Sequence, residues 1–114
     1  MDIDQGDRME KISLEELSRK IIKPWSPIDA MFVNDSAIRI AKMEGEFVWH
    51  RHDNGDEFFL VHDGEFTLHT EEQNFNLKKG ECILVPKGVL HCPETNSSAT
   101  VLVFELKETK QYGD

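Results

Sequence analysis

The chain has 114 residues, a length that predicts one domain with its own hydrophobic core. Its 22 acidic and 13 basic residues give a formal net charge of −9, which repels a phosphate backbone and argues against nucleic-acid binding. Two cysteines, no signal-peptide pattern and apolar runs of strand length predict a reduced, cytoplasmic protein that does not span a membrane.

The N-terminal part of the chain, residues 1–26, predicts an extension that carries one short helix. Ser13 and Glu16 have the spacing of a capping box, in which the two side chains satisfy free amides at a helix start. Pro24 ends the pattern, because the residue before a proline avoids helical dihedrals. We therefore expect a helix at about residues 13–22.

From residue 27 to residue 107 the sequence changes to short apolar runs separated by turn residues. The strand candidates are residues 28–33, 38–43, 47–52, 57–62, 66–70, 75–77, 82–85, 89–92 and 100–106. Many short strands at this spacing are typical of an all-β sandwich or barrel. No long helical pattern alternates with them, which argues against a parallel α/β sheet. Residues 108–114 form a short polar tail.

Three histidines and one glutamate form a candidate metal site within this β region. His50 and His52 are two residues apart, so on an extended segment both side chains point to the same face. Glu57 follows five residues later, and His91 comes from a separate segment. Imidazoles with one carboxylate suit zinc, iron, manganese or nickel, and the residue types do not decide among these ions.

Two spaced blocks of the sequence carry a family resemblance. The first runs from residue 45 to 64, each end a glycine, and contains the histidine pair and Glu57; the second runs from Gly80 to His91. These blocks closely resemble the paired motifs of the cupin superfamily. One departure is Thr95, which stands where many members have an asparagine after the second motif's histidine.

The resemblance implies a fold and a ligand set. The fold would be a double-stranded β-helix, the jelly-roll barrel of small single-domain cupins, over residues 27–107. His50, His52, Glu57 and His91 would converge inside the barrel on one divalent metal ion. Cupins of this size often dimerise, and we expect a homodimer that uses the apolar segment 21–32.

Parity along the strands indicates which other side chains face the pocket. Val48 shares the parity of the histidine pair, and Phe59 and Val61 share that of Glu57. Arg39 is a candidate anchor for an anionic substrate, with a solvated surface charge as the alternative.

The remaining histidines and the cysteine beside His91 carry weaker signals. His62 and His69 lie outside both motifs and are expected on the exterior. Cys92 should point away from the metal, because neighbours on a strand face opposite ways.

The function implied by the resemblance is a mononuclear metalloenzyme that acts on a small organic molecule. Oxygen-dependent cleavage, as in the dioxygenase-like branch, and isomerisation of a sugar or sugar phosphate both fit. Glu57 could act as a base if it leaves the metal, and the sequence indicates no other acid or base. It also lacks a basic cluster that would hold a phosphate. The alternative is a non-catalytic cupin module that binds a metal or a small ligand.

Overall fold

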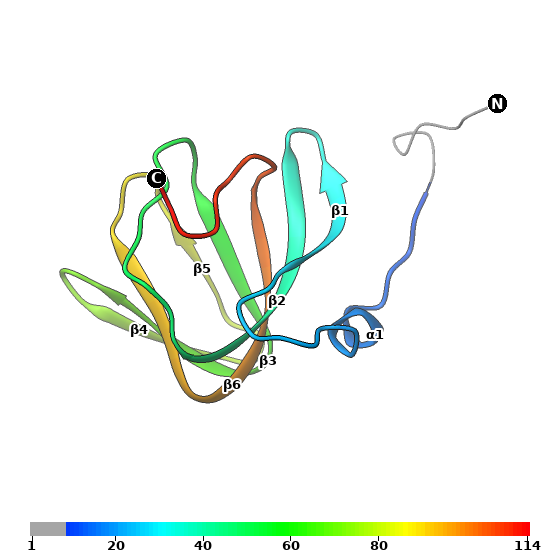
Figure 1. Ribbon diagram of the computed structural model, residues 1–114, viewed down its shortest axis with the longest axis horizontal. Helices are drawn as coiled ribbons and strands as arrows, with labels where there is room; N and C mark the ends of the chain where they lie inside the picture. The colour runs from blue at the N-terminus through cyan, green and yellow to red at the C-terminus, as the bar shows by residue number, and fades with distance from the viewer. Residues whose placement is uncertain (1–8) are drawn as a thin grey trace.

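Strands make up most of the regular structure of this computed structural model, which describes residues 9–114 (Figure 1). One short helix, α1 (Leu14–Ser18), precedes six strands: β1 (Ile28–Val33), β2 (Ser36–Glu46), β3 (Glu57–Thr70), β4 (Asn74–Lys78), β5 (Cys82–Val85) and β6 (His91–Leu106). All pairings are antiparallel, in the order β1-β2-β6-β3-β4, and β5 pairs with β3. The all-β jelly roll predicted from the sequence is confirmed. The first eight residues of the predicted extension lie outside the described residues.

Two strands are much longer than the sequence predicts. The residues between the strand candidates 57–62 and 66–70 include Asp63-Gly64, a pair typical of turns, but they form none, and the two candidates join into β3. In the same way β6 runs through residues 93–98 and joins the candidates 89–92 and 100–106. The β3–β6 pairing instead shifts register between Val61 and Asp63 and again between Gly64 and Thr67. Bulges of this kind bend a strand without ending it, and the curved sheet can then close on itself.

Gly64 is the residue that permits the bend. Its φ is +77°, a left-handed conformation that L side chains rarely adopt. A Cβ at this position would lie 2.2 Å from the carbonyl oxygen of Ser98 on the paired strand β6. Both the backbone angle and the close approach therefore require glycine.

The interior of the barrel is filled by alternate residues of β2, β3 and β6. Met43, Phe59, Val61, Phe66 and Val101 are among the buried side chains of this cluster, each at most 4 % exposed. The sequence also predicts a strand at 47–52, but this segment is irregular apart from an isolated bridge at its fourth residue. Period-two reasoning therefore does not apply there.

The N-terminal helix is shorter than predicted and lies beside the barrel (Figure 1). The Ser13 hydroxyl accepts the Glu16 N–H at 3.2 Å, which is one of the two hydrogen bonds of a capping box. After Ser18 the chain tightens, since the Ile21 N–H bonds to the Ser18 carbonyl three residues back. Ile21, which follows the helix, is buried. The helix itself contacts β2, and Ile40 of that strand is fully buried. No helix among residues 9–114 is long and apolar enough to cross a membrane.

The contact at Gly64 predicts a large stability difference between two glycine variants. Gly64→Ala combines backbone strain with a backbone clash, and should lower the free energy of unfolding by about 3 kcal/mol or more. Gly80 has a similar φ, +85°, but no atom of another part of the chain lies within 4 Å of the position that a Cβ would occupy. Gly80→Ala therefore introduces the backbone strain without a clash, and should lower the free energy of unfolding by about 1 kcal/mol. Urea unfolding of the metal-free proteins measures both, and equal losses would contradict a close approach at Gly64.

Candidate metal centre

Four buried side chains from three parts of the chain meet at one point inside the barrel. His50 and His52 come from the irregular segment before β3, Glu57 is the first residue of β3, and His91 is the first residue of β6. Each offers one ligand atom, and these atoms all lie within 4.8 Å of one another. The backbones of His50 and His91 exchange two N–H···O bonds, at 3.0 and 2.9 Å, which holds the two imidazoles together.

Backbone carbonyls orient two of the three imidazoles. Nδ1 of His50 lies 2.9 Å from the Val48 carbonyl oxygen, and Nδ1 of His91 lies 2.8 Å from that of Val89. A carbonyl only accepts, so each Nδ1 donates and carries the proton. Nε2 of the neutral ring is then left with a lone pair, which is the tautomer that a metal ligand needs. Burial lowers the pKa of His50, which favours that neutral form.

The third imidazole lacks hydrogen-bond partners. Both ring nitrogens of His52 are buried without a hydrogen bond, and Nε2 lies 3.4 Å from Oε1 of Glu57. Leaving a buried polar atom unpaired costs about 1–3 kcal/mol, so such an atom calls for an explanation. A divalent cation bound between the imidazoles and the carboxylate would satisfy one of the two nitrogens, Nε2, which is the one beside Glu57. The four residues therefore fit a metal ion, and the cluster could hold one.

Glu57 is held in its ionised form. Burial alone would raise its pKa, but the imidazoles of His52 and His91 outweigh burial and hold the pKa of Glu57 below its ordinary value. Nε2 of His91 lies 3.2 Å from Oε1 of Glu57, so without a metal ion a proton joins these two atoms, and a bound cation would take its place. A carboxylate that remains ionised is what a cation requires of a ligand.

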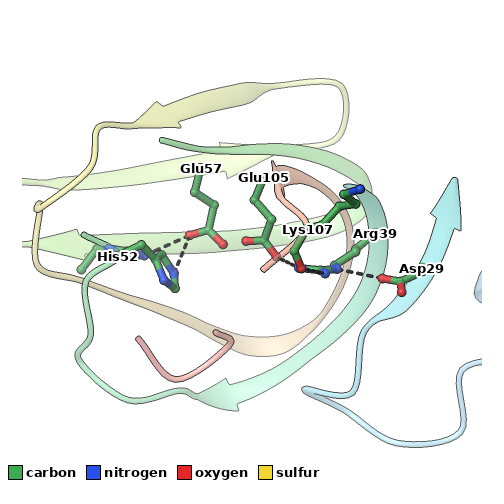
Figure 2. A network of polar contacts seen from close by, with 7 residues as sticks. Asp29, Arg39, His52, Glu57, Glu105 and Lys107 are labelled. Carbon is green, nitrogen blue, oxygen red and sulfur yellow. Dashed lines mark hydrogen bonds and ion pairs between the residues drawn. The ribbon is translucent and has the colours of Figure 1, made fainter. Parts of the chain in front are cut away.

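A second carboxyl group, from Glu105, faces Glu57 (Figure 2). Burial and the neighbouring Glu57 charge raise the pKa of Glu105 to about 8. On its other side Glu105 accepts a hydrogen bond from Arg39, which also donates to Asp29 at 2.8 Å and to the Lys107 carbonyl at 2.7 Å. A continuous polar row thus runs from the imidazoles to the side of the barrel where β1 lies.

These groups open onto a cavity of about 200 Å³. His50 and Glu57 lie in its wall together with Arg39 and Glu105. The rest of the lining is mostly apolar: Trp25, Pro27, Ala41, Met43, Phe47, Phe59, Pro93 and Val103, with Thr109 and Gln111 from the C-terminal segment. Mostly apolar walls with a few convergent polar groups are typical of small-molecule sites.

The C-terminal segment supplies Thr109 and Gln111 to the lining of this cavity and is bonded to its rim. The Gln111 side chain donates to the Trp25 carbonyl, and the Tyr112 ring lies against Phe47 with centroids 5.0 Å apart. The Asp114 N–H bonds to the carbonyl of Arg51, between the two histidines. The polar tail expected at 108–114 therefore forms part of the pocket wall.

The structure brings together some of the pocket candidates and separates others. Phe59 and Arg39 line the cavity, whereas Val61 is buried in the core outside its lining. Val48 is 46 % exposed and outside the lining, because its segment is not a regular strand. The two remaining histidines lie away from the cluster, paired with glutamates of α1 and β6.

Sequence reasoning missed Glu105 and the C-terminal residues. Glu105 follows Val101 and Val103 at period two, so its inward direction was readable from parity once that strand's core face was known. Thr109 and Gln111 carry no comparable signal, because only the path of the tail brings them to the cavity.

Comparisons with known proteins agree with this geometry. The family model described as "Cupin domain" matches residues 37–106. The uncharacterized protein YdbB of Bacillus subtilis is 33% identical over 85 residues, which are 64% of this chain and 75% of that protein. The crystal structure of a cupin-2 domain containing protein from Shewanella frigidimarina has a TM-score of 0.82 and 33% identity, covering 84% of this chain and 94% of that one. KdgF from Halomonas sp., at 19% identity, a TM-score of 0.63 and coverage of 72% and 78%, shares the fold.

The ligand set predicts a metal-binding defect for one histidine variant and not for another. His52→Ala should weaken zinc binding at least about tenfold, since loss of a direct ligand exceeds the effect of losing a supporting hydrogen bond. His62→Ala is the matched control, because His62 pairs with Glu15 outside the cluster and its loss should leave the affinity unchanged. Titration against a competing chelator measures both, and equal affinities for His52→Ala and the wild type would show that the ligand set is wrong.

Proposed function

Because the chain belongs to the cupin family and gathers three imidazoles and a carboxylate beside one cavity, we propose that it is a mononuclear metalloenzyme acting on a small organic molecule. The observation that carries the proposal is the convergence of four buried ligand atoms beside the cavity, with both ring nitrogens of His52 lacking partners. When bound, a divalent ion would supply Lewis-acid activation of an oxygen atom, or a place where substrate and dioxygen meet.

The protein's own residues support catalysis over simple storage of a metal. Two of the side chains in the cavity wall, those of His50 and Glu57, belong to the ligand set, so a molecule in the cavity touches the metal centre. Glu105 lines the same space and is not one of the four ligands. By position it is the candidate to exchange a proton with a bound molecule, a role that the sequence had not assigned.

Two reaction classes remain within the proposal, oxygen-dependent cleavage and isomerisation. The alternative is a non-catalytic module that binds a metal or a small ligand. All these functions use the same four ligands, and they differ in whether a bound molecule is chemically changed.

The deciding experiment is turnover by protein loaded separately with iron(II), manganese(II), nickel(II) and zinc(II). The compounds tested are hydroxy acids, oxo acids, thiols and sugars. Their conversion is measured by oxygen uptake and by NMR of the reaction mixture. We expect conversion of at least one compound by at least one metal form. If none of the four metal-loaded forms converts any compound while the metal stays bound, the result would support the non-catalytic alternative.

A pair of glutamate variants tests the role of Glu105. Glu105→Gln should lower turnover about 100-fold and leave the metal content unchanged, because a positioned proton-transfer group contributes at least this factor. Glu108→Gln removes a carboxylate of the exposed tail and should behave as the wild type. Full activity of Glu105→Gln would remove Glu105 from the reaction.

A further inference from the structure

We propose that Gly113 and Asp114 of the C-terminal segment position the metal-binding histidines, and that the metal centre loses affinity when their contacts are removed. This inference rests on the proposed function, because it concerns the ligands of the metal centre. It gives the two residues a role toward the metal, whereas the C-terminal segment was described above only as part of the pocket wall.

The histidine pair lies on a segment that lacks the support of a regular strand. Residues 47–52 are irregular apart from the bridge between His50 and His91, whose backbones exchange two hydrogen bonds. The His52 carbonyl accepts the Gly88 N–H at 2.8 Å. These bonds leave the backbone groups on either side of His52 without a partner in the barrel strands, and buried or half-buried backbone groups need one.

Asp114 supplies the partners on both sides of His52. Its N–H donates to the Arg51 carbonyl at 3.0 Å, and its side-chain oxygen Oδ2 accepts the Asp53 N–H at 2.7 Å. The ring nitrogens of His52 make no hydrogen bond, so its imidazole depends on packing and on its backbone for orientation. Asp114 therefore holds the backbone of the one ligand whose ring has no hydrogen bond of its own.

Gly113 brings the same segment into direct contact with the other histidine of the pair. Its φ is +87°, and a Cβ added there would lie 2.6 Å from the Arg51 carbonyl oxygen and 2.9 Å from Cβ of His50. The Tyr112 ring packs on Phe47, and the Phe47 ring meets the His50 imidazole at nearly a right angle, with centroids 5.3 Å apart. A side chain at residue 113 would displace either the segment or the histidine.

Positioning of this kind acts on metal affinity because a ligand that is already in place loses less conformational freedom when the ion binds. Groups that orient metal ligands typically contribute about 10- to 100-fold to the affinity. The coupling is reciprocal: if the bonded C-terminal segment raises the affinity for zinc, bound zinc stabilises the bonded segment by the same factor. Both directions can be measured.

Two variants of Asp114 separate positioning from charge. Asp114→Ala removes the acceptor of the Asp53 N–H and should weaken zinc binding about tenfold in competition with a chelator. Asp114→Asn loses the charge but keeps an oxygen that accepts, so it should bind zinc as tightly as the wild type. The visible spectrum of the cobalt(II) form, which reports ligand geometry, should change only in Asp114→Ala. Equal losses of affinity in both variants would mean that Asp114 acts through its charge, and the positioning role would be wrong.

A pair of glycine variants tests the contact with His50. Gly113→Ala should weaken zinc binding at least about tenfold, because the segment must move away from the histidine. Gly80→Ala introduces a similar backbone strain where no atom is close, so it should lower the stability of the metal-free protein and leave the zinc affinity unchanged. The same zinc affinity in both glycine variants would contradict the role of Gly113.

Hydrogen exchange of the wild-type protein tests the reverse direction without a substitution. The Asp114 amide, which donates to Arg51, should exchange about tenfold more slowly in the zinc-bound protein. The Glu81 amide, which donates to the Lys78 carbonyl in the turn before β5, is the control and should exchange at the same rate in both forms. An Asp114 rate that does not change when zinc binds would overturn the coupling.

Zinc content, measured on each sample, separates the inference from the proposed function. Wild-type protein that holds no zinc contradicts the metal centre and the proposed function with it. Wild-type protein that holds zinc, together with an Asp114→Ala variant that binds it equally tightly, overturns the positioning role alone. The Asp114 variants give this answer even if Gly113→Ala does not fold.

Discussion

The bend shared by β3 and β6 is the constraint on which the site depends. His91 is paired with Thr70, thirteen positions along β3 from Glu57, and a straight strand would separate these positions by about 40 Å. Yet the His91 imidazole lies 3.2 Å from the Glu57 carboxylate. Only a sheet that curls back on itself brings them together, and the bulges around Gly64 provide that curvature.

Each polar side chain in the row from the imidazoles to Asp29 interacts with the next one along the row. The imidazoles hold Glu57 ionised, Glu57 and burial favour the neutral form of Glu105, and Glu105 shares Arg39 with Asp29. Burial of so many titratable groups is costly unless each has a partner. The exception is His52, whose ring nitrogens make no hydrogen bond although Nε2 lies 3.4 Å from the Glu57 carboxylate, and this is the place where a cation would complete the network.

Local sequence patterns predicted the strands where they are regular, and they failed to predict the structure where the chain bends. Asp63-Gly64 has the composition of a turn, but a glycine with positive φ serves a bulge equally well. Local sequence does not distinguish the two, since the choice depends on whether a partner strand continues alongside. The β6 strand provides that partner, so β3 continues to Thr70.

The sequence by itself determined the four residues of the cluster, His50, His52, Glu57 and His91. These residues stand at the spacings of two cupin motifs, and imidazole and carboxylate groups are ligands that divalent metals prefer. Parity also placed Phe59 in the cavity wall, since β3 is regular at that point. Tertiary structure alone decided that Glu105 faces Glu57 and that the C-terminal segment lines part of the cavity. Both arise from contacts between segments far apart in the chain, and such contacts depend on the bend and closure of the barrel and leave no local periodicity.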